Sequence, residues 1–198
     1  MQLARDPAEL TSAATDLLLA ALAAAGAFRS RRPLWRPIFS GLGLVSLLGA
    51  AVHGLALAPG TLQTIWIVLN LAFGLTVSLF ALAAVRDRAG AAVARQAAAP
   101  LVILGLLVGG LAQAFPATFL PFVVFNACVL IGVGLSAAFL SQWPLAAGCL
   151  IALVAGTFQA TGWRLVLIWE FDHNGLFHLV QMPALLLWIR GARGQPPT

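Results

Sequence analysis

Three histidines and one aspartate are the residues of this chain whose types and spacing could do chemistry. His53 lies near the end of one apolar stretch, His173 and His178 open another, and Asp16 lies inside the first. Three imidazoles that converge from two helices predict a Zn²⁺ site with an open fourth position for water. Zn²⁺ lowers the pKa of such a water to about 7. Asp16 and Asp172 are therefore the predicted catalytic carboxylates, which would orient the water or move protons.

Three polar residues are expected to hydrogen-bond around this site: Ser46, Asn70 and Asn174. The spacing of the last two histidines needs an irregular helix start. His173 and His178 are five positions apart, or about 140° around a helix, whereas Asn174 and His178 share a face. Either His173 precedes the first turn, with Asp172 or Asn174 as N-cap, or a π-bulge brings the two histidines together.

Composition decides what kind of scaffold must hold these residues. Of 198 residues, 61% are hydrophobic and only 9% are charged, against about 25% charged in soluble domains. This excludes a soluble enzyme and a nucleic-acid-binding domain. Lysine is absent, which excludes a retinal or pyridoxal Schiff base because both need an amine. The composition predicts an all-α integral membrane protein with membrane lipids as partners.

Seven stretches are long and apolar enough to cross a bilayer, which takes about 20 residues. They cover residues 8–28, 37–57, 62–85, 97–114, 119–140, 144–161 and 174–189 of one transmembrane domain. The arginines gather in the segments 29–36, 86–96 and 190–193, which share one side of a seven-helix bundle. Because basic loops stay in the cytoplasm, we expect the N-terminus outside and the C-terminus inside, in a bacterial inner membrane.

Two segments fall outside the seven helices. The segment 163–172 is apolar but short and carries two tryptophans, which predicts an extension of the sixth helix or a helix at the membrane interface. A β-strand is not expected there, because an isolated strand leaves its backbone unpaired in lipid. The tail 190–198 is expected to be disordered.

The layout resembles the CREST superfamily, which comprises alkaline ceramidases, progestin and adiponectin receptors and Per1-like proteins. The resemblance covers the whole topology, and in motif it rests on His53 and on FDHNGLFH, residues 171–178. It implies that the three histidines bind zinc and that a Ser and an Asp complete a site for hydrolysis of lipid amides. Gly49 stands at the family's Ser position, four residues before His53, and the closing motif is HxxxxH instead of HxxxH.

Three classes of function therefore remain open at the level of sequence. The first is a zinc-dependent hydrolase of a lipid amide or ester, and the second is a receptor or assembly bundle without metal. The third is a protein with a single haem, held by His53 and His178 from opposite helices.

Overall fold

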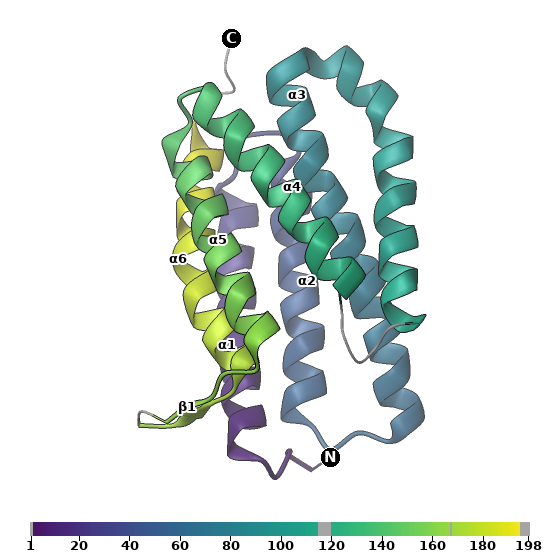
Figure 1. Ribbon diagram of the computed structural model, residues 1–198, viewed down its shortest axis with the longest axis vertical. Coiled ribbons are helices and arrows are strands. Elements are labelled where there is room, and N and C mark those ends of the chain that lie inside the picture. Colours follow the sequence, from purple (N-terminus) through teal and green to yellow (C-terminus); the bar gives the residue numbers. More distant parts are fainter. Residues whose placement is uncertain (1, 115–119, 167, 195–198) are drawn as a thin grey trace.

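The computed structural model describes residues 2–114, 120–166 and 168–194, which form a bundle of long helices (Figure 1). The helices run roughly along the long axis and leave the N-terminus and the last described residues at opposite ends. In chain order the helices are α1 (Pro7–Arg29), α2 (Trp35–Gly54), α3 (Pro59–Ala114), α4 (Leu120–Phe139), α5 (Trp143–Thr161) and α6 (His173–Arg193). The predicted all-α class is confirmed, and the boundaries agree with the sequence within a few residues except in α3.

Helix α3 joins two of the expected spans without a loop. The predicted connection 86–96 is helical, and the chain reverses at Gly90, whose φ of 88° and ψ of 171° are not helical. Only glycine adopts this conformation readily. A single residue, Gly90, therefore makes the break between the two spans, where the sequence predicted a loop over residues 86–96. The expected start at residue 119 and the connection 115–118 lie outside the described residues.

The two halves of α3 pack against each other through glycine. A Cβ on Gly105 would stand within 2.8 Å of the carbonyl carbon of Gly74, and one on Gly109 would stand 2.6 Å from the Asn70 carbonyl oxygen. Ser78 Oγ donates to the Leu101 carbonyl at 2.6 Å across the same contact. Small residues thus allow close backbone approach, as in other membrane helix pairs.

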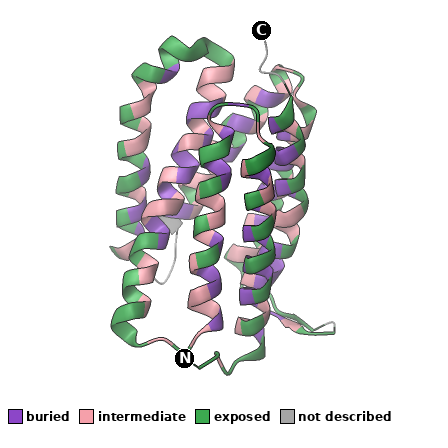
Figure 2. Cartoon of the chain, turned by 180° about the vertical axis from the view of Figure 1, so that it is seen from behind, coloured by how far each residue is buried: buried purple, intermediate pink, exposed green. Residues whose placement is uncertain are grey.

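The interior of the bundle is apolar and aromatic at its centre. Buried residues face inward along each helix, and exposed residues cover the outside (Figure 2). Trp35, Phe80 and Trp188 stack edge to face near the core, while large side chains such as Phe139 and Leu135 are exposed. Five of the described helices are long and apolar enough to cross a membrane. An apolar outer surface of this kind is what lipid requires.

The segment after α5 corrects the sequence prediction. It forms two short antiparallel strands, β1 (Leu165–Val166) and β2 (Glu170–Phe171), instead of a helix. The exclusion of a strand was wrong because the hairpin pairs its own backbone and projects from the end of the bundle (Figure 1). The expected tail is also shorter, since α6 continues to Arg193; residues 195–198 lie outside the described part.

Candidate functional site

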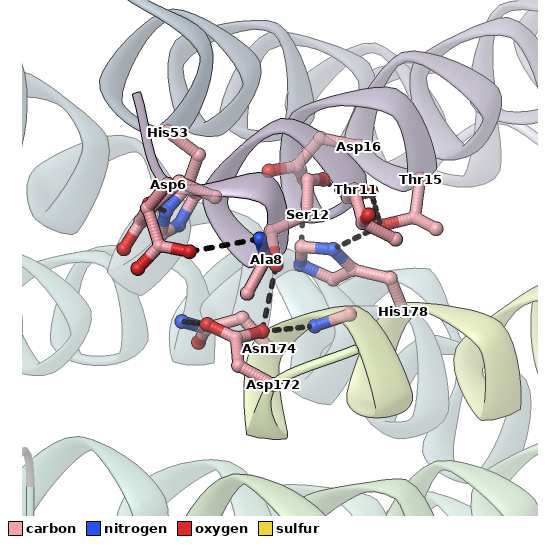
Figure 3. A network of polar contacts seen from close by, with 12 residues as sticks. Asp6, Ala8, Thr11, Ser12, Thr15, Asp16, His53, Asp172, Asn174 and His178 are labelled. Atoms are coloured by element: carbon pink, nitrogen blue, oxygen red, sulfur yellow. Dashed lines mark hydrogen bonds and ion pairs between the residues drawn. The ribbon is translucent and has the colours of Figure 1, made fainter. Parts of the chain in front are cut away.

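One face of α1 carries the polar side chains from which the site is built. Glu9, Ser12 and Asp16 are three and four positions apart, so they lie on one side of the helix. Asp6 caps this helix by accepting from the Ala8 N–H at 2.9 Å. This face meets α2 and α6 at the N-terminal end of the bundle (Figure 3). We call Glu9, Ser12, Thr15, Asp16, His53, Asp172 and His178 the polar cluster.

His53, near the end of α2, is paired with Glu9. Its Nδ1 lies 2.6 Å from Glu9 Oε2, and because a carboxylate only accepts, Nδ1 carries a hydrogen. In the neutral form of the ring, Nε2 then has a lone pair. A histidine anchored in this way through one nitrogen is the usual arrangement around metal ions. The histidine ring also meets Trp66 edge-on, with 6.2 Å between ring centroids.

His178, in the second turn of α6, is held by two residues of α1. Its Nδ1 lies 3.0 Å from Thr15 Oγ1, and the Thr15 hydroxyl in turn donates to the Ser12 carbonyl at 2.8 Å. Since that hydroxyl has one hydrogen, it accepts from His178 Nδ1–H. His178 Nε2 therefore points a lone pair at Asp16 Oδ1, 3.4 Å away. A proton on one of these two groups, or a metal ion bound to both, would make their contact favourable.

Asp16 lies against Gly49 of α2 and fills the space that a side chain at that position would occupy. A Cβ on Gly49 would lie 2.5 Å from Asp16 Oδ2 and 3.0 Å from its Cγ. Gly49 is one helical turn before His53, so the glycine lets the carboxylate sit against α2 beside that histidine. Asp16 is only 4% exposed, as the expected intramembrane position implies.

Asp172 closes the cluster at the start of α6. It is the N-cap, accepting from the Gly175 N–H at 2.9 Å and from Ser12 Oγ at 2.7 Å through the same oxygen. Burial raises the pKa of this carboxyl, but the bonds from Gly175 and Ser12, the nearby His173 and Asn174 outweigh it and hold the pKa below its ordinary value. Asp172 therefore stays ionised and ties α6 to α1.

The remaining predicted residues are only partly brought together. Asn174 donates to Asp172 Oδ2 at 3.4 Å and accepts from Gln159 at 2.8 Å. Asp172 is the N-cap, as one of the expected arrangements has it, but His173 is the first residue of α6 instead of preceding its first turn. Ser46 and Asn70 are buried on α2 and α3. In the described part of the chain, neither has a hydrogen bond to the polar cluster.

Zinc ligation by three histidines stays a prediction. Within residues 2–114, 120–166 and 168–194, no three His, Cys, Asp or Glu side chains gather as a preformed metal-binding group. The sequence reasoning missed Glu9, Ser12 and Thr15 as members of the cluster. Their spacing relative to Asp16 on one helix face was the signal that could have revealed the first two.

Together the apolar spans and the buried polar cluster define an integral membrane protein with a helical fold. Residues 11–196 match the model of the family of unknown function DUF6962, and the chain belongs to that family. No curated protein and no solved structure matches the chain.

Proposed function

We propose that the polar cluster is a zinc-dependent hydrolytic centre, of the kind that CREST-like membrane proteins use on lipid amides and esters. Asp16 and His178, which face each other, would be two of the zinc ligands. His53 would be the third, and because the three do not form a group around one point, its side chain would have to turn toward them when the metal binds. The observation that carries this proposal is the separation of 3.4 Å between His178 Nε2 and Asp16 Oδ1.

That separation suits a shared metal ion better than a direct hydrogen bond. Nitrogen and oxygen atoms joined by a hydrogen bond usually lie 2.7–3.2 Å apart. Two ligands of tetrahedral Zn²⁺, each at about 2.0–2.1 Å from the metal, lie about 3.3 Å apart. The lone pair on His178 Nε2, fixed by the Thr15 contact, faces the carboxylate as a ligand would.

His53, like His178, is held by a neighbouring side chain through its Nδ1. Glu9 accepts from His53 Nδ1, so Nε2 would be the nitrogen that binds a metal, and the carboxylate of Asp16 lies against Gly49, one turn away on the same helix. His173 is left out of this proposed set because, among the described residues, it has no hydrogen bond or ion pair with Asp16 or His178. The proposed ligands are therefore two histidines and an aspartate instead of three histidines.

Zn²⁺ in such a site acts as a Lewis acid and lowers the pKa of a water ligand to about 7. The side chains of this chain would hold the reacting groups. Ser12 and Thr15 lie in the same cluster, where the Ser12 hydroxyl holds Asp172 and the Thr15 hydroxyl contacts His178. During hydrolysis, water adds to the carbonyl carbon, the bond to the amine or alcohol breaks, and a carboxylate passes the proton to the leaving group.

We also propose the seven-span topology that places this centre in the outer leaflet. The break at Gly90 divides α3 into two spans, which gives seven in all with α6. Arginines cluster at the α1–α2 connection, around Gly90 and at the end of α6, which lie at the end of the bundle opposite to the polar cluster. By the positive-inside rule the arginine-rich end is cytoplasmic, and in a bacterium the membrane would be the inner one.

A second candidate is a receptor or assembly bundle without metal. It is favoured by the fact that the polar contacts join different helices: Glu9 to His53 from α1 to α2, and Thr15 to His178 from α1 to α6. In that case Asp16 and His178 share a proton. Such contacts contribute about 0.6 kcal/mol each in a membrane protein, and this candidate predicts no bound metal.

Elemental analysis of detergent-purified protein, prepared without chelators, separates the two candidates. We expect about one zinc per chain in the wild type, lost in Asp16→Asn and in His178→Ala. His173→Ala is the matched control and keeps its zinc. Loss of zinc in His173→Ala would restore the three-histidine site, and a metal-free wild type would favour the receptor or assembly bundle.

Two measurements on the same sample complete the test. The protein is expected to be colourless, and a Soret band would instead indicate haem. In proteoliposomes that contain a lipid amide or ester, zinc-loaded wild type should release fatty acid and Asp16→Asn should not. Bound zinc without any hydrolysis would keep the metal site and reject the enzymatic role.

A further inference from the structure

A second polar site lies at the arginine-rich end of the bundle, away from the polar cluster. Arg32, in the connection between α1 and α2, is only 3% exposed. Its Nη2 donates to Asp87 of α3, and its Nη1 donates to Gln142 Oε1, the N-cap residue of α5, at 2.9 Å. One guanidinium thus links the α1–α2 connection to α3 and to the start of α5.

This arrangement leaves buried donors without partners in the described part of the chain. They are Arg32 Nε, Trp35 Nε1 and Gln142 Nε2, with the hydroxyl of Ser136 beside them. Trp35 is 2% exposed, so its indole N–H is cut off from solvent. Leaving such groups unsatisfied costs free energy, which makes a cluster of four unusual for a purely structural site.

Three of these groups, those of Trp35, Ser136 and Gln142, line a small cavity that is partly open to the surroundings. Trp35, Asp87, Ser136 and Gln142 all line it, together with apolar residues of α3, α4 and α5, and its volume is about 10 Å³. A space of this size admits one atom the size of a water oxygen. The occupant is therefore an oxygen, either of water or of a larger group that reaches in from outside.

The charges around the cavity select an anionic group. Arg32 and Asp87 balance each other, and the remaining charge nearby is positive. Arg88 lies over the ring of Phe139, with its guanidinium carbon 3.7 Å from the ring centroid, and Phe139 follows Ser136 by one helical turn. Basic pockets between membrane helices are typical binding places for phosphate headgroups.

We propose that this cavity binds a phosphate oxygen of an anionic phospholipid from the leaflet at the arginine-rich end. The oxygen would accept from Trp35 Nε1 and from Ser136 Oγ or Gln142 Nε2, while Arg88 faces the rest of the headgroup. The site lies at the membrane–water boundary, where the headgroups of that leaflet are. This inference is independent of the zinc proposal.

Native mass spectrometry of the full-length protein tests it with phosphatidylglycerol, phosphatidylcholine and inorganic phosphate as separate probes. We expect wild type to retain phosphatidylglycerol more tightly than phosphatidylcholine. Trp35→Phe and Ser136→Ala, which each remove one donor, should each weaken phosphatidylglycerol binding about tenfold, the value of one hydrogen bond to a charged group.

Matched controls come from the rest of the bundle. Trp188→Phe makes the same change at another buried indole, one that does not line this cavity, and Ser46→Ala removes a buried hydroxyl of α2 outside it. Both should bind phosphatidylglycerol like wild type. Equal retention of the two lipids, or Trp35→Phe and Ser136→Ala that bind like wild type, would overturn the proposal in favour of an ordered water. Binding of inorganic phosphate without lipid would assign the site to a free anion instead.

Discussion

Gly49→Ala is the sharpest perturbation of the polar cluster, because it adds one methyl group and removes nothing. The new Cβ would lie 2.5 Å from Asp16 Oδ2 and 3.1 Å from Oδ1. Ordinary contact begins at 3.4 Å, so the carboxylate must move by about 0.9 Å. Asp16 has a short, buried side chain, and such a movement changes the position of its carboxylate relative to His178 Nε2.

The magnitude follows from two opposing effects on stability. Overpacking of a tight site costs about 1–3 kcal/mol, and replacing glycine by alanine within a helix returns about 1 kcal/mol. The net loss of stability is therefore about 0–2 kcal/mol, and the protein should still fold. Zinc affinity is expected to fall about 10–100-fold, as it does when a group that orients a metal ligand is displaced.

The assay compares Gly49→Ala with Gly132→Ala in the same detergent. A Cβ on Gly132, in α4, has no neighbour within 4 Å, so this control should keep both its zinc and its apparent melting temperature or gain slightly in the latter. Titration with a competing chelator gives the zinc affinity, and thermal unfolding gives the stability. If Gly49→Ala binds zinc as tightly as Gly132→Ala, the reasoning that Asp16 must sit against α2 is refuted.

Three further perturbations test other parts of the structure. Glu9→Gln keeps the shape of the partner of His53 but removes its charge, and should lower zinc affinity about tenfold by chelator competition; unchanged affinity would remove Glu9 from the site. Because the folded-state pKa of Asp172 is lowered, its ionised form stabilises the fold above its unfolded pKa of about 3.9, and this stability is lost as the pH falls further through the folded pKa. Asp172→Asn should therefore lower the melting temperature at pH 7 and less so at pH 3, and a pH-independent difference would contradict the assignment. Gly105→Ala pushes the two halves of α3 apart and should destabilise by about 1–3 kcal/mol or more, whereas Gly110→Ala, with open space around it, should not; equal unfolding temperatures would argue against the close crossing.

The exposed hairpin after α5 shows where sequence reasoning failed for a physical reason. Its residues are apolar, and an isolated strand in lipid would be costly, so the sequence favoured a helix. The chain instead leaves the bundle at that point and pairs β1 with β2. Trp163 and Trp169 are both more than half exposed, and their expected position at the membrane interface stays a prediction.

Local patterns determined the membrane class, the apolar spans and their approximate bounds, because hydrophobic length and charge are properties of short stretches of chain. The same patterns singled out Asp16 and His178 as candidate site residues. The partners of these residues depended on helix packing, which no local pattern encodes. That Glu9 holds His53, that Ser12 holds Asp172, and that Gly49 makes room for Asp16 follows only from how α1, α2 and α6 meet.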